Sequence, residues 1–216
     1  MRINPIINSY KIKSFGAKSK EMRNLDDANR SARAQFNSIP SSSFYLMKLQ
    51  DVYKNPNISL RKKMEFQENT NDLLIRTIML RNELEGAETI DEIMALVQKY
   101  KIANCGEMSL YLQEKLKSVG YDAKRISLTI ARRQGAPVGR YKREMFDHVF
   151  VLVNDKKDAD WQQPKTWGSK AIILDPWTGV ADYKDEAITK IKNYLKVDPE
   201  NEYLLFDRCF SDIECR

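Results

Sequence analysis

Apolar residues recur at helical spacing through the first half of the chain. The pattern predicts a helix over residues 44–53, capped by the serines before it, and a second helix over residues 59–86. A third helix should begin after Thr89, because Glu92 three residues later completes a capping box. We therefore predict a helical subdomain over residues 41–100.

The pattern changes at Cys105, where a helical run begins that stops at a glycine about four turns later. Three short runs typical of strands follow, over residues 123–131, 147–153 and 170–175. The last two are apolar on both faces, as expected of strands in the middle of a domain. The predicted fold class is α+β: a helical N-terminal half packs on a core, residues 101–216, in which a cysteine at a helix N-terminus accompanies a small antiparallel sheet.

The 216 residues carry a formal net charge of +6, most of it near the N-terminus. Residues 1–40 contain eight Lys or Arg against three acidic residues, whereas the rest of the chain is close to neutral. A basic segment of this kind is typical of a mobile, solvated arm, with a targeting segment or a partner-binding arm as alternatives. Because the body has no basic excess, we do not expect a nucleic-acid partner.

No apolar run approaches the roughly 20 residues of a membrane span, and the N-terminus lacks the apolar stretch of a secretory signal. Three cysteines are an odd number for a disulfide framework, which indicates a reducing compartment and at least one free thiol. We expect synthesis in the cytoplasm, and a non-classical, effector-type route for any secretion.

Cys105 falls in the first turn of its predicted helix, where unpaired N–H groups and the helix dipole favour a thiolate. Such a nucleophile needs an imidazole partner, and His148 is the only histidine in the chain. If the second and third strands pair with Val153 opposite Lys170, five steps along the ladder bring His148 opposite Asp175. An acid there would orient the imidazole and stabilise its cation.

Each of these residues also has an ordinary structural explanation. A cysteine at a helix start is often a small buried residue, a lone histidine on a strand is often structural, and an aspartate before Pro-Trp often only forms a turn. The joint pattern of Cys105, His148 and Asp175 is rarer than any of the three, and it favours a catalytic triad.

Three short motifs carry these residues: N-C-G-E-M-S at 104–109, D-H-V-F-V-L-V at 147–153 and I-I-L-D-P-W at 172–177. As a set they resemble the catalytic core of the transglutaminase-like branch of papain-like cysteine hydrolases, in particular bacterial toxin and effector deamidases and proteases. The resemblance covers about residues 98–180. It implies that Cys105 is the nucleophile, His148 the general acid and base, and Asp175 the orienting acid, without a cofactor.

The oxyanion of such a reaction needs hydrogen-bond donors. We expect the backbone N–H of Cys105 to be one, and the side-chain amide of Gln98 or Asn104 to be the second; the alternative for Asn104 is an ordinary N-cap. Residues 132–146 form a basic loop that leads into the strand of the histidine. We interpret this loop either as a docking strip for an acidic protein surface or as a solvated loop. The candidate substrate-binding residues are Arg140, Arg143 and Trp177.

The predicted function is a cysteine hydrolase that deamidates glutamine or cleaves peptide bonds in a protein substrate. The alternative is a non-enzymatic adaptor that binds through the basic arm and the loop 132–146. A zinc site built from Cys105, Cys209, Cys215 and His148 is not expected, since no two cysteines have the close spacing of such sites.

Overall fold

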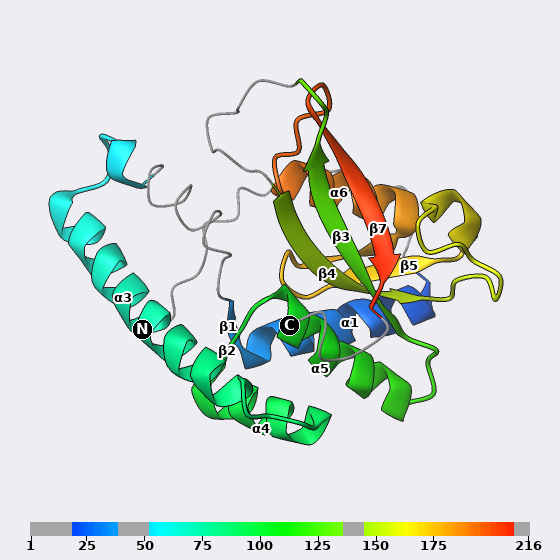
Figure 1. The fold of residues 1–216 in the computed structure, drawn as a ribbon, viewed down its shortest axis with the longest axis horizontal. Coiled ribbons are helices and arrows are strands. Elements are labelled where there is room, and N and C mark those ends of the chain that lie inside the picture. The colour runs from blue at the N-terminus through cyan, green and yellow to red at the C-terminus, as the bar shows by residue number, and fades with distance from the viewer. Residues whose placement is uncertain (1–18, 39–51, 136–144, 210–216) are drawn as a thin grey trace.

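The computed structural model describes residues 19–38, 52–135 and 145–209 (Figure 1). It is a mixed α+β fold, as predicted. Its helices are α1 (Lys20–Gln35), α3 (Leu60–Leu84), α4 (Ile90–Tyr100), α5 (Cys105–Ser118), the short 3-10 helix η1 (Pro164–Trp167) and α6 (Lys184–Tyr194). Its strands are β1 (Asn37–Ser38), β2 (Ile102–Ala103), β3 (Lys124–Arg132), β4 (Met145–Val153), β5 (Ile172–Asp175), β6 (Val180–Tyr183) and β7 (Glu202–Arg208).

The main sheet has five antiparallel strands in the order β6-β5-β4-β3-β7. The three predicted strands are confirmed as β3, β4 and β5, and the prediction of a small antiparallel sheet holds. The edge strands β6 and β7 were not predicted. β6 follows a turn and β7 follows α6, and the alternation of apolar and polar residues is weak in both segments.

The predicted register of β4 on β5 was wrong by two residues. Val153 pairs with Ile172 rather than with Lys170, so that the continued ladder places Phe150, not His148, level with Asp175. Because side chains alternate with a period of two, an even shift leaves His148 and Asp175 on the same face of the sheet. The two residues are therefore diagonal neighbours, still within reach of each other.

Local capping explains why the helices begin where they do. Ser59 accepts from the N–H of Lys62 at the start of α3, and Thr89 and Glu92 form a complete capping box on α4. The predicted helix over residues 44–53 lies almost entirely outside the described residues. In the part of the chain that the structure describes, no helix has both the length and the apolar content that crossing a bilayer would require.

The prediction of a mobile basic arm over residues 1–40 was wrong for residues 20–38, whereas residues 1–18 lie outside the described residues. Residues 20–35 form α1, whose buried side chains recur at helical spacing and contact α5 and the sheet; they are Met22, Leu25, Asn29 and Ala32. Lys20, Arg23 and Arg30 are exposed, whereas Arg33 is half buried, so the basic composition concealed an amphipathic helix. After α1, the strand β1 pairs in parallel with β2, directly before Cys105.

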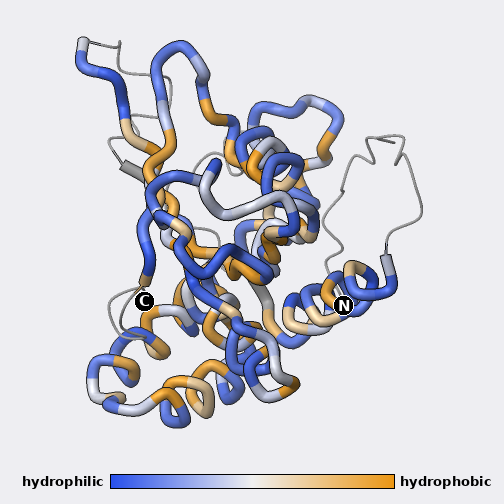
Figure 2. Tube along the Cα trace, turned by 90° about the vertical axis from the view of Figure 1, so that its right-hand side faces the viewer, coloured by the Kyte–Doolittle hydropathy of each residue, from blue (hydrophilic) through white to orange (hydrophobic). Residues whose placement is uncertain are grey.

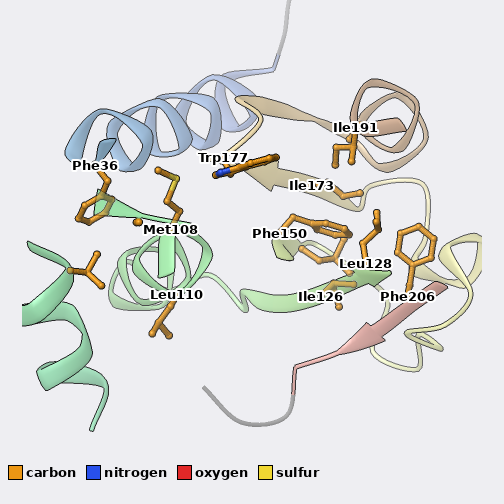
Figure 3. Packing of buried hydrophobic residues seen from close by; sticks show 14 of the residues in the cluster. Phe36, Met108, Leu110, Ile126, Leu128, Phe150, Ile173, Trp177, Ile191 and Phe206 are labelled. Carbon is orange, nitrogen blue, oxygen red and sulfur yellow. The ribbon is translucent and has the colours of Figure 1, made fainter. Parts of the chain in front are cut away.

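Apolar side chains fill both faces of the sheet. Val151, Val153 and Leu174 pack with residues of α1 and α5 on one face. Phe150 and Ile173 pack with Ile191 of α6 on the other face (Figure 3). Figure 2 shows hydrophilic residues on the peripheral loops and hydrophobic residues alternating with hydrophilic ones along the helices. The apolar residues of α4 and of the C-terminal part of α3 join the same cluster as those of the sheet, so the helical half and the core share one interior.

Candidate active site

Cys105 is the first residue of α5, and a capping box formed by Asn104 and Glu107 fixes the start of this helix. The side-chain oxygen of Asn104 accepts from the N–H groups of Gly106 at 2.8 Å and Glu107 at 3.2 Å. The side chain of Glu107 in turn accepts from the backbone N–H of Asn104 at 2.7 Å. Cys105 therefore sits in a rigid first turn, where its own N–H has no intrahelical acceptor. Its side chain is partly exposed, and it is the one free cysteine among the described residues.

His148 and Asp175 form a fully buried pair. Nε2 of His148 lies 2.7 Å from Oδ2 of Asp175, and neither side chain is exposed to solvent. The pair joins β4 to the end of β5 across a separation of 27 residues. The structure thus brings together the histidine and the acid that the sequence singled out.

The carboxylate of Asp175 is held by the turn that follows it. Its Oδ1 accepts from the N–H groups of Trp177 and Thr178, both at 3.1 Å, and its Oδ2 accepts from the hydroxyl of Thr178 at 2.5 Å. The N–H of Gly179 donates to the backbone carbonyl of Asp175 at 2.8 Å. Asp175 is therefore a turn former and the partner of His148 at once, which satisfies a buried charge with several donors.

The imidazole of His148 is held in its cationic form. Burial by itself lowers the pKa of His148, but the charge of Asp175, its hydrogen bond and the side chain of Cys105 outweigh burial and raise the pKa to about 10. Because Nε2 is taken by Asp175, Nδ1 is the nitrogen left for the sulfur of Cys105, which interacts with the same ring. Cys105 therefore lies near enough to the His148–Asp175 pair to influence the pKa of the imidazole.

Trp177 covers the imidazole. Its ring lies 5.3 Å from that of His148 and 5.7 Å from that of Tyr194, measured between centroids, and only 3% of the residue is exposed. Trp177 therefore packs against the imidazole, and its burial leaves little of it to contact a substrate. The other two candidate substrate-binding residues, Arg140 and Arg143, lie outside the described residues.

The two candidate oxyanion donors differ in position. Asn104 precedes Cys105 directly, and its side-chain oxygen serves as the N-cap acceptor, which leaves its amide NH₂ for another partner. Gln98 lies exposed in the last turn of α4. The structure therefore keeps Asn104 beside Cys105, whereas Gln98 is exposed to solvent.

Sequence reasoning missed two supporting residues. Glu107 is 2% exposed and forms an ion pair with Arg81 of α3, which ties that helix to the first turn of α5. Thr178 donates to both carboxylate oxygens of Asp175, through its N–H and its hydroxyl, and the hydroxyl oxygen accepts from the N–H of Val180. The N-x-x-E capping pattern and the D-x-x-T turn pattern were the signals for them.

Among the described residues, no three His, Cys, Asp or Glu side chains gather as a metal site would require. No family model, curated protein or solved structure matches the chain. The function is therefore inferred from the geometry of Cys105, His148 and Asp175.

Proposed function

We propose that this protein is a cysteine-dependent hydrolase that acts on a carboxamide or peptide bond of a protein substrate. The observation that carries the proposal is the buried His148–Asp175 pair next to a partly exposed cysteine at a helix N-terminus. A structural histidine needs no such carboxylate, and a structural cysteine needs no such imidazole. Together they provide what nucleophilic catalysis requires.

The first half of the reaction forms a thioester. The thiolate of Cys105 attacks the carbonyl carbon, and the carbonyl electrons move onto its oxygen, which the N–H of Cys105 stabilises. The tetrahedral intermediate then collapses: the C–N bond breaks while the imidazolium of His148 gives its proton to the departing nitrogen. Ammonia leaves from a carboxamide, and an amine leaves from a peptide bond.

The second half restores the enzyme. Neutral His148 takes a proton from water, whose oxygen attacks the thioester carbonyl. The C–S bond breaks, the acid product leaves, and the thiolate is again paired with an imidazolium. Asp175 keeps the ring oriented and its cation stabilised throughout, without itself taking the proton.

The choice of substrate class follows from the resemblance of the three motifs to transglutaminase-like and papain-like hydrolases of the deamidase and protease type. The arrangement of a cysteine-bearing helix and an antiparallel sheet that carries the histidine and the acid supports assignment to that fold. A protein amide is also a carbonyl that an exposed thiolate can reach while the acid and base stay buried.

The test uses the purified protein and its Cys105→Ala variant with casein as a general substrate. Released ammonia without fragments would indicate deamidation, fragments would indicate proteolysis, and incorporation of a labelled primary amine would indicate acyl transfer. In each case the Cys105→Ala variant should be inactive but folded, as judged by circular dichroism. Activity that survives in Cys105→Ala would contradict the proposal, as would iodoacetamide labelling of Cys105 no faster than that of the unfolded chain at pH 6.

A further inference from the structure

Two side chains of α1 hold the outer side of the turn that follows β5. Nη1 of Arg33 donates to the backbone carbonyl of Trp177 at 3.3 Å. One turn earlier, Nδ2 of the fully buried Asn29 donates to the carbonyl of Val180 at 3.0 Å. The helix thus binds the turn at two carbonyls on either side of its glycine, and Trp177 lies close to α1 in Figure 3.

Gly179 is the position where α1 and the turn come closest. Its φ is +82°, a conformation that side chains rarely adopt, and a Cβ there would clash with Nη1 of Arg33. The guanidinium also lies near Tyr194: burial raises the pKa of this tyrosine, the charge of Arg33 lowers it, and that of Asp175 raises it. Arg33 therefore sits directly behind the acid of the candidate site.

A single peptide unit connects Arg33 to Asp175. The carbonyl of Trp177 and the N–H of Thr178 belong to the same planar, trans peptide group and point in opposite directions. Arg33 binds the carbonyl end and Oδ1 of Asp175 accepts from the N–H end, at 3.1 Å. Fixing one end of the plane fixes the other end, so α1 controls the direction of a donor that holds the carboxylate.

We propose that Arg33 and Asn29 are positioning residues for Asp175, which keep the turn of residues 175–180 in the one orientation that presses the carboxylate against His148. The inference rests on the proposed function, because it assigns these residues a role in the same site. Both residues bond to backbone carbonyls of the turn, so their effect on the site passes through the turn. Without them the peptide plane after Trp177 is free to rotate, and Asp175 loses a donor that aligns it.

The test measures His148 itself, which as the only histidine gives a single imidazole signal in NMR. In Arg33→Gln we expect the pKa of His148 to fall by about one pH unit, a tenfold change in the proton affinity of the ring. The rate of iodoacetamide reaction with Cys105 at neutral pH should fall with it, because a less basic imidazole takes the thiol proton less completely. Asn29→Ala should shift both quantities in the same direction, and Arg33→Lys by less than Arg33→Gln.

Arg30→Gln is the matched control. Arg30 lies on the same helix, its side chain is 65% exposed, and it forms ion pairs with Asp26 and Asp27 on the surface of that helix. Its removal should leave the pKa of His148 and the alkylation rate unchanged. Gly179→Ala supplies a second test that keeps the guanidinium but displaces it, and it should act in the same direction as Arg33→Gln.

The outcomes separate this inference from the proposed function. If Arg33→Gln lowers the melting temperature but leaves the pKa of His148 and the reactivity of Cys105 as in the wild type, Arg33 is only structural and the inference fails. If Arg33→Gln does not fold, Arg33→Lys and Gly179→Ala decide by the same two measurements. A wild-type protein without hydrolytic activity whose histidine still responds to Arg33→Gln would overturn the proposed function and leave the positioning role standing.

Discussion

Arg81 and Glu107 form an ion pair that joins the C-terminal part of α3 to the helix that begins with Cys105. The carboxylate is buried and also accepts from the N–H of Asn104, whereas the guanidinium is partly exposed. The first turn of α5 is thus fastened to a helix from the other half of the chain.

Replacement of Arg81 by Met should destabilise the protein by about 1–3 kcal/mol, because a buried carboxylate loses its charged partner. Urea unfolding measures this change. Arg61→Met is the matched control on the same helix: the Arg61–Glu65 pair is largely exposed and its loss should cost about 0.5 kcal/mol or less. Adding Glu107→Gln to Arg81→Met should recover part of the lost stability, and a double variant no more stable than the single one would contradict this account.

The protonation of His148 should make stability depend on pH. Its pKa in the folded protein is raised from 6.5 to about 10, so its contribution is complete below pH 6.5 and is lost as the pH rises through about 10. The free energy of unfolding of the wild type should therefore fall between pH 6.5 and 10 more steeply than that of His148→Gln. Parallel curves for the two proteins would show that the imidazolium is not held in the folded state.

Thr178→Val should remove one of the hydrogen bonds that hold the carboxylate of Asp175. The variant keeps the shape of the side chain but removes the hydroxyl that donates to Oδ2 of Asp175, the same oxygen that His148 contacts. We expect a loss of about 1–3 kcal/mol in stability and a lower pKa of His148, read from its NMR titration. Thr189→Val is the control, since that hydroxyl bonds only a helix carbonyl in an exposed position. Equal effects of the two variants on the histidine would refute the role of Thr178.

Asn104→Ser tests the second oxyanion donor. Serine preserves the N-cap about as well as asparagine but has no amide NH₂. If that amide donates to the oxyanion, kcat should fall by about 10²-fold with little change in the melting temperature. Gln98→Ala, on the exposed part of α4, should leave kcat near the wild-type value. The reverse result would assign the donor to Gln98.

The sequence predicted those elements whose signals are local. The caps at Ser59 and Thr89, and the run that starts at Cys105, mark helices that the structure contains. The contact of His148 with Asp175 was also predicted, although from a register that was off by two residues. It held because an even shift keeps both side chains on one face of the sheet.

The remaining features depend on contacts between distant segments, which spacing alone does not reveal. The amphipathic pattern of α1 was hidden by its exposed Lys and Arg residues, so the helix was interpreted as a mobile arm. The ion pair of Arg81 with Glu107 joins residues 26 positions apart, and the bond from Arg33 to Trp177 joins residues 144 positions apart. Arginines usually lie in solvent, so no pattern distinguished Arg33 or Arg81.

The parallel pairing of β1 with β2 has a practical consequence for anyone who wishes to shorten this protein. Within about ten residues, the chain from Asn29 to Ser38 supports both the turn after the acid and the strand that leads to the nucleophile. A fragment cut at residue 101 would retain every reacting side chain yet lose the scaffold that aligns them. A shortened protein that keeps this scaffold must therefore begin upstream of Lys20.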